Sequence, residues 1–290
     1  MPTKKARVAA DSSAILKRCR SMLLAGWEDL RATRRAVLKT FDPDDIHDLR
    51  VASRRFRALV KLFEPWMPSK NAASMNKKVR KLTRTLGVLR NIDEAQLFFR
   101  RHSSTDSGPE SLLCRDLPEM RGDEMKRVAK TLALFDQNGL ERVVQKLAVS
   151  LEKERSADGD SISLPGYFSN ISISLFQAIH ALLPAAAFRE ARETRHSLRI
   201  AIKKWRYFLE IAGPALDFDC SSILGLLREY QSILGGMNDV AEFGRLCEKL
   251  TLSQHERGIV ENILRAEDEI LLEKFEELIR QKPLTYYFVA

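Results

Sequence analysis

The feature that most constrains this chain is Ile46 to Met67, a segment whose charged and apolar residues separate when it is drawn as a helix. At about 100° per residue, its basic positions fall within an arc of roughly 80°. Those basic positions are His47, Arg50, Arg54, Arg57 and Lys61, and the apolar positions opposite them are Leu49, Ala52, Phe56, Leu59, Val60 and Phe63. Because Asp48 is the one acid between His47 and Lys61, the segment is predicted to be an amphipathic helix with an almost purely cationic face.

The same pattern returns in residues 196–209, HSLRIAIKKWRYFL, at a constant offset (196 − 47 = 149). The repeated basic positions are His196, Arg199, Lys203, Lys204 and Arg206, which stand for His47, Arg50, Arg54, Arg55 and Arg57. The apolar face is repeated in Leu198, Ala201, Trp205 and Phe208, and residues 235–239 repeat residues 87–91 at nearly the same offset. The chain is therefore predicted to be an internal repeat: a loose tail (1–10), a first helical bundle (11–155), a linker (156–166) and a second bundle (167–290).

An all-α fold is predicted for both halves. Charged residues make up 30% of the chain, and 13 Gly and 10 Pro are few for 290 residues, which favours long helices over many turns. We expect about five or six helices in each half. Another basic helix is expected at residues 71–89, where Lys77, Arg80, Lys81 and Arg84 share one arc.

Several helix boundaries are predicted from local signals. Asp42 and Pro43 indicate an N-cap and first helical position. Residues 90–93 are expected to form a turn that caps a following helix, and Asn138-Gly139 a helix end. Pro184 and the pair 213–214 are expected to stop two helices of the second half.

Net charge and cysteine content limit the classes of partner and the compartment that can be expected for the protein. A net charge of +9 indicates a polyanionic partner, which can be a nucleic acid, an acidic membrane surface or a phosphate polymer. The four cysteines lack a CxxC pair, which favours a reducing cytoplasm, and the basic N-terminus leads into no apolar signal segment. We therefore expect a soluble cytoplasmic protein that does not insert into membranes.

Enzyme and metal motifs are missing from the sequence. It contains no GxSxG, Walker P-loop or GxGxxG, and its five histidines form no HxxxH or HExxH. The residues beside His47 and His196 are arginines, which repel metal cations. We expect no metal, no cofactor and no enzymatic activity, with phosphate transfer through one of these histidines as an open alternative.

The repeated basic faces are suited to binding phosphates. Arginine presents a planar fork of donors, lysine a point charge, and histidine a donor that gains charge below about pH 6.5. Packing such faces together without a ligand would desolvate like charges, so we infer a hydrated basic groove. Sequence-nonspecific nucleic-acid binding stays open, although Phe56 and Trp205 lie on the apolar faces and only Tyr207 lies near the basic arc.

HDLRVASRRFR and HSLRIAIKKWR resemble the two signature segments of the CHAD domain, the conserved histidine α-helical domain, and the segments that begin at Leu86 and Leu234 are similar to the next element of that family. The resemblance covers residues 12–280. It implies two pseudo-symmetric helical bundles around a basic central cavity, and binding of inorganic polyphosphate, often at polyphosphate granules. The ligand residues that it implies are His47, Arg50, Arg54, Arg55, Arg57, His196, Arg199, Lys203, Lys204 and Arg206. The helical arcs add Lys61, Lys77, Arg80 and Arg84.

The two repeats differ in charge. Glu210 stands at the position of Lys61, Glu229 at that of Lys81, and Ser232 at that of Arg84. Asn91 occupies a position where the family more often has Asp. We therefore expect the first repeat to hold the ligand more strongly than the second.

Overall fold

The computed structural model describes residues 4–66, 69–102, 116–152 and 164–286, and within these ranges it contains helices and no strand. The all-α prediction is confirmed. The elements are α1 (Lys4–Thr40), α2 (Pro43–Leu62), the 3-10 turn η1 (Glu64–Trp66), α3 (Ser69–Arg101), α5 (Asp116–Ala133), α6 (Gln137–Glu152), α7 (Leu164–Ala186), α8 (Arg192–Leu216), α9 (Ser221–Cys247) and α10 (Gln254–Gln281).

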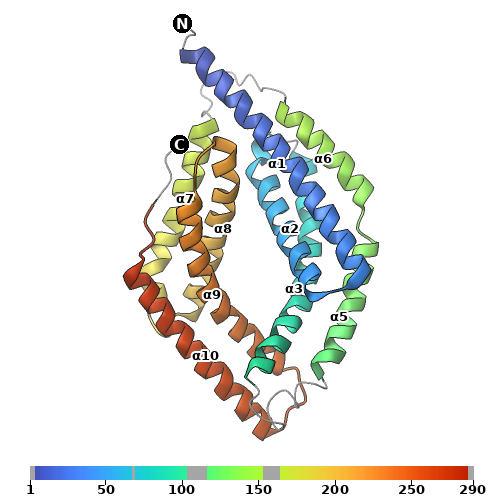
Figure 1. The fold of residues 1–290 in the computed structure, drawn as a ribbon, viewed down its shortest axis with the longest axis vertical. Coiled ribbons are helices and arrows are strands. Elements are labelled where there is room, and N and C mark those ends of the chain that lie inside the picture. Colours follow the sequence, from blue (N-terminus) through green and yellow to red (C-terminus); the bar gives the residue numbers. More distant parts are fainter. Residues whose placement is uncertain (1–3, 67–68, 103–115, 153–163, 287–290) are drawn as a thin grey trace.

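The helices form two groups that lie side by side (Figure 1). In the first group α2 packs between α1 and α3, while α6 lies against α1 and α5 against α3. In the second group α7 packs on α8, α8 on α9, and α9 on α10. The groups meet where α8 contacts α1 and α2 and where α3 contacts α9. The described part of the second group thus has four α-helices, fewer than expected, and the predicted repeat symmetry and domain boundaries stay predictions.

The two signature helices bury the faces that their apolar spacing predicts. Phe56 of α2 and Trp205 of α8 are fully buried, and the other apolar positions of both arcs are at most 7% exposed. Trp27 of α1 packs on Phe56 with 5.6 Å between ring centroids, while Phe176 of α7 packs on Trp205 at 5.1 Å. This burial fixes the rotation of each helix, so the basic arcs must point away from the two cores.

The predicted start of α2 is also confirmed. Asp42 is the N-cap, and its carboxylate accepts a hydrogen bond from the backbone N–H of Asp44 at 2.8 Å. Pro43 occupies the first turn, where its missing N–H leaves no bond unmade.

The prediction of a turn at residues 90–93 is wrong, because α3 continues through these residues to Arg101. Asp93 does not cap a helix: its carboxylate is buried and accepts from Arg121 of α5 at 2.6 Å. Likewise α9 continues through Gly235 and Gly236. A Cβ on Gly236 would lie 3.0 Å from Leu271, so this glycine permits close packing of α10 rather than ending α9.

Other boundaries also differ from the predictions. Helix α1 begins at Lys4, inside the expected tail. The break near residue 138 lies earlier, since Asp136 accepts from the backbone N–H of Gly139 at 2.9 Å and thereby caps the start of α6. Pro184 and Pro214 lie inside the last turns of α7 and α8. Most of the predicted linker falls outside the described residues, and 164–166 begin α7.

By length and composition alone, α7 could cross a membrane. One such helix is weak support for insertion, because core helices of water-soluble proteins have the same composition. Phe168 and Ile179 of α7 are buried and the helix packs along α8, but only 17% of its apolar window is buried inside the structure.

Candidate functional site

Four basic side chains from the two signature helices gather where α2 meets α8. We call them the central cluster: Arg50 and Arg54 of α2, and Arg199 and Lys203 of α8. Burial, with the like charges of Arg54 and Arg199, lowers the pKa of Arg50 to about 10. Burial, with the charges of Arg54, Arg199 and Arg50, lowers the pKa of Lys203 to about 6. The structure therefore holds cations from opposite halves of the chain close enough to repel one another.

One carboxylate partly compensates for this repulsion. Asp239 of α9 attracts Arg199, Lys203 and Arg50 and so favours their charged forms. Burial raises the pKa of Asp239 itself, against the influence of Arg199. A second carboxylate, that of Glu242 on α9, also favours the charged form of Arg199. Two acids near the four members of the central cluster leave the site with a positive charge.

Several guanidinium donors in this region are buried and unpaired. The Nε–H groups of Arg50, Arg57, Arg199 and Arg206 are inaccessible to solvent and have no hydrogen-bond partner among the described residues. Leaving a buried donor without an acceptor costs about 1–3 kcal/mol. Arg31 and Arg34 of α1 also have a buried Nε–H without a partner, so this feature is not confined to the basic faces. At the central cluster it coincides with repulsion between like charges, and an acceptor-rich ligand would relieve both.

The cationic surface extends from the central cluster along both helices. Burial lowers the pKa of Arg57, and the charges of Arg80 on α3 and Arg54 add to this effect, so Arg80 lies near that end of α2. Beside the central cluster, Arg55 of α2 and Arg206 of α8 both approach the carboxylate of Glu210. The distance from this carboxylate is 3.8 Å for Arg55 Nε and 3.6 Å for Arg206 Nη1. Arg206 also covers the ring of Tyr207, at 4.9 Å from its centroid.

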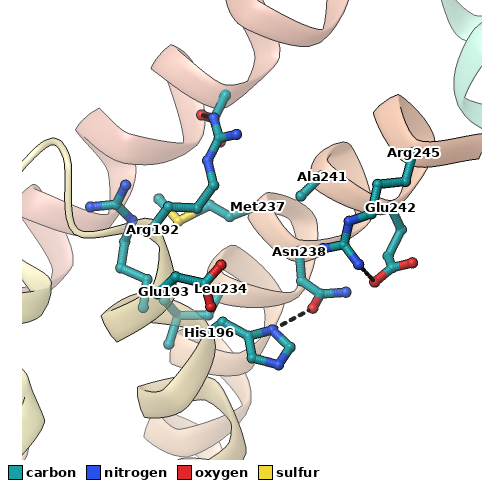
Figure 2. Close-up of a pocket in the computed structure, with 11 residues that line it drawn as sticks. Arg192, Glu193, His196, Leu234, Met237, Asn238, Ala241, Glu242 and Arg245 are labelled. Carbon is teal, nitrogen blue, oxygen red and sulfur yellow. Dashed lines mark hydrogen bonds and ion pairs between the residues drawn. The ribbon is translucent and has the colours of Figure 1, made fainter. Parts of the chain in front are cut away.

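The two histidines lie in different surroundings. His47 is half-buried, and burial together with the positive charge of Arg90 lowers its pKa, so it is less easily protonated than an exposed histidine. Arg90 is itself ion-paired with Glu94 on the same helix. His196 is exposed, and its Nδ1 lies 2.9 Å from Asn238 Oδ1 (Figure 2).

His196 borders a pocket of about 470 Å³ between α8, α9 and α10. The pocket has charges of both signs. Arg192 pairs with Asp268 at 2.7 Å. Arg245 pairs with Glu242 at 2.9 Å (Figure 2). Arg195, also in its lining, is buried and donates to three backbone carbonyls between residues 186 and 189. Since these charges are paired, the pocket lacks the excess positive charge of the central cluster.

The predicted site residues thus separate into three sets. The first consists of the central cluster with its extension, Arg50, Arg54, Arg57, Arg80, Arg199 and Lys203. The second flanks it and consists of His47, Arg55 and Arg206. The third is exposed, Lys61, Lys77, Arg84, His196 and Lys204, and His196 lies in the mixed-charge pocket.

Two charged residues near the basic faces, Asp239 and Arg90, were not predicted as site residues from the sequence. Asp239 and Arg90 lie in the repeated segments 235–239 and 87–91, to which no ligand role was assigned from the sequence. Because α3 and α9 continue there, these residues lie on helical faces that approach the signature helices. Among the described residues, no group of three or more His, Cys, Asp or Glu could hold a metal ion.

Comparisons with known proteins agree with this architecture. The model of the CHAD domain family matches residues 21–248. The crystal structure of the CHAD domain from the plant Ricinus communis is similar, with a TM-score of 0.67 and 19% identity over 94% of this chain and 93% of that chain. PptA from Streptomyces chartreusis is also similar, with a TM-score of 0.67 and 13% identity over 92% of this chain and 99% of that chain. No curated protein matches the chain.

Proposed function

The chain belongs to the CHAD domain family, and we propose that it binds inorganic polyphosphate across the central cluster without acting on it as an enzyme. The family is associated with polyphosphate-related proteins. We further propose that the protein is cytoplasmic and binds polyphosphate at granules, where that polymer accumulates.

The observation that carries this proposal is the meeting of the two basic faces, where cations of α2 and α8 repel one another and several Nε–H donors are buried without a partner. Each unit of polyphosphate offers anionic oxygens, which are strong acceptors for guanidinium groups. Such a ligand satisfies the donors and neutralises the repulsion between Arg50, Arg54 and Arg199 at the same time. The energetic penalty of the empty site is thereby removed on binding.

The spacing of the cations favours a polymer over a single phosphate. Arg50, Arg54 and Arg57 lie at successive turns of α2, and a helical turn advances by about 5.4 Å. Arg199, Lys203 and Arg206 follow the same spacing on α8. One orthophosphate cannot meet two rows of this length, whereas a chain of phosphates can contact several members of each row.

The positions of the aromatic residues favour polyphosphate over nucleic acid. Single-stranded nucleic acids are held by aromatic side chains on which bases stack. Phe56 and Trp205 on the signature helices are fully buried, and Tyr207 is covered by the guanidinium of Arg206. The basic faces of α2 and α8 therefore present charge to a ligand but little surface for bases.

A titration with long-chain polyphosphate tests the proposal. Arg50→Ala combined with Arg199→Ala should weaken binding by about 100-fold or more, since each charge-assisted hydrogen bond contributes about 1.5–3 kcal/mol. The control, Lys130→Ala with Lys146→Ala, removes two exposed cations from α5 and α6 and should change affinity little. Equal affinities for the two double variants would refute the proposed site.

Two further assays address the alternatives. If single-stranded RNA displaces polyphosphate at equal phosphate concentration, the protein is a general polyanion binder. Phosphate release with and without Mg²⁺ should show no turnover, and sustained release would contradict the non-enzymatic role. Binding should also weaken steeply as salt increases, because each phosphate contact releases counterions.

A further inference from the structure

His196 of α8 is hydrogen-bonded to Asn238 of α9 at the edge of the mixed-charge pocket. The Nδ1 atom of His196 lies 2.9 Å from Asn238 Oδ1 (Figure 2). The amide nitrogen of the same asparagine donates to the carboxylate of Asp239 at 3.4 Å. Because a carboxylate only accepts hydrogen bonds, the nitrogen end of the amide faces Asp239 and the oxygen end faces the ring.

This orientation of the amide decides which ring nitrogen of His196 carries the hydrogen. A neutral imidazole has one N–H and one lone pair, and an amide oxygen can only accept. Nδ1 must therefore be the donor to Asn238, which leaves Nε2 with a lone pair as long as the ring is neutral. A lone pair at Nε2 faces a phosphate oxygen as one acceptor faces another, so neutral His196 has no hydrogen bond to offer to polyphosphate.

The equivalent position in the first repeat holds an arginine. Segment 87–91 repeats segment 235–239, so Arg90 stands for Asn238 (238 − 90 = 148), as His47 stands for His196. A guanidinium has donors and no acceptor, so Arg90 cannot hold a hydrogen on a ring nitrogen of His47. Burial and the positive charge of Arg90 also lower the pKa of His47. The two signature histidines therefore differ in chemistry, although their positions are repeated.

His196 lies on the row of basic residues that the proposed ligand follows along α8. Arg199 of the central cluster comes three residues later, which is about one helical turn. The side chain of His196 is exposed while its Nδ1 is bonded to Asn238. Nε2 is therefore the ring atom that is left for a phosphate oxygen.

The other charged groups around the His196 ring balance one another. Those that line the pocket are Arg192, Glu193 and Arg195 of α8, Glu242 and Arg245 of α9, and Asp268 of α10. They comprise three cations and three acids, and four of the six form the ion pairs described above. Helices α1, α2 and α7 also pack on α8, but none of their described residues lines this pocket. A phosphate oxygen at Nε2 is thus the main addition of charge that His196 would meet.

We propose that Asn238 is a positioning residue that keeps the hydrogen of neutral His196 on Nδ1, so that His196 donates from Nε2 to polyphosphate only after it has taken up a second proton. This inference deepens the proposed function and rests on it. The proton comes from solvent and binds the lone pair of Nε2, and the new N–H donates to a phosphate oxygen. The contact is therefore gained in acid and lost as pH rises through the range in which histidines titrate.

The tautomer of His196 is measured directly by ¹⁵N NMR. A long-range ¹H–¹⁵N spectrum of the whole protein labelled with ¹⁵N-histidine, recorded at pH 8.5, distinguishes a ring nitrogen that carries hydrogen from one with a lone pair. His196→Gln identifies the signals of His196 by their loss. We expect hydrogen on Nδ1 in the wild type and in Asn238→Asp, which retains an acceptor oxygen, and a mixture of both tautomers in Asn238→Ala. Asn262→Ala, at an exposed asparagine of α10, is the matched control and should leave the tautomer unchanged.

The affinity for long-chain polyphosphate at pH 6 and at pH 8 supplies a second measurement. In the wild type the contact of His196 is present at pH 6 and absent at pH 8, whereas Asn238→Ala can form it at both. The ratio of the two affinities should be about fivefold smaller in Asn238→Ala, since one hydrogen bond contributes about 1 kcal/mol. Protonation of His47 and of the phosphate groups contributes equally in both proteins and cancels in this comparison.

The outcomes separate the inference from the proposed function. Hydrogen on Nε2 in the wild type, or an unchanged tautomer in Asn238→Ala, overturns the role of Asn238 whether or not polyphosphate binds. Equal ratios of affinity in the two proteins overturn the contact through Nε2 while polyphosphate binding stands. Absence of binding by the wild type contradicts the proposed function itself. If Asn238→Ala loses the native circular dichroism spectrum, Asn238→Leu, which has a similar size and no acceptor, is the second variant and has the same expected results.

Discussion

Replacing Lys203 by methionine should stabilise the ligand-free protein. Methionine retains an apolar stem of similar length but carries no group to be desolvated next to three arginines. In the unfolded chain Lys203 has its ordinary pKa of 10.5, whereas in the folded protein its pKa is about 6. Folding at neutral pH therefore requires the lysine to give up a proton that it would hold in water.

The size of this effect follows from the distance between the working pH and the unfolded pKa. A lysine whose pKa is lowered on folding destabilises the protein most below the folded pKa, and the penalty disappears as pH approaches the unfolded pKa. At 1.36 kcal/mol per pH unit, the penalty is about 5 kcal/mol at pH 7 and about 2 kcal/mol at pH 9. The pH window in which it changes runs from about 6 to 10.5.

Urea unfolding followed by circular dichroism, at pH 7 and at pH 9, measures both values as the difference between Lys203→Met and the wild type. The melting temperature of Lys203→Met should rise by roughly 8 °C at pH 7, given the usual unfolding entropy of a chain of this size. Lys204→Met, one residue further and exposed, should change stability by less than about 0.5 kcal/mol at either pH. A destabilised Lys203→Met protein, or a difference that does not shrink at higher pH, would refute the reasoning.

Three other substitutions have separate consequences. Glu210→Gln removes the carboxylate near Arg55 and Arg206 and should tighten polyphosphate binding about fivefold, as measured in the same titration; weaker binding would show that Glu210 instead positions those arginines. Arg195→Leu breaks donations of 2.6, 2.9 and 3.3 Å to three carbonyls and should lower the melting temperature by about 5 °C in differential scanning fluorimetry; no change would mean that water replaces the guanidinium. Asp42→Ala should cost about 1 kcal/mol in urea unfolding through loss of the α2 cap, and an unchanged midpoint would contradict that role.

Much of the fold could be predicted because the apolar arcs of the signature helices are unambiguous. Phe56 and Trp205 had to be buried, and their burial determined where the basic residues point. The cap at Asp42 was equally clear, since a local hydrogen bond within two residues decides it. These are the features that depend on one helix and its immediate neighbours in sequence.

Features that depend on contacts between distant helices were not predictable in the same way. A glycine at position 236 suggests the end of a helix when only the sequence is considered. In the fold its missing side chain makes room for Leu271 of α10. Asp93 suggests a cap, but its partner Arg121 lies on another helix. The hydrogen bond between His196 and Asn238 of α9 could not be predicted from the spacing of α8 alone.

The position of the central cluster ties ligand binding to the cohesion of the whole chain. Helices α2 and α8 belong to different groups, and the groups meet at only a few helix pairs within the described residues. A polymer that contacts both basic rows then links segments that are about 150 residues apart in sequence. Its binding free energy stabilises the contact between the two groups of helices. Polyphosphate should accordingly slow hydrogen exchange most at backbone amides that open when the halves separate, whereas phosphate chains too short to reach both helices should leave that exchange unchanged.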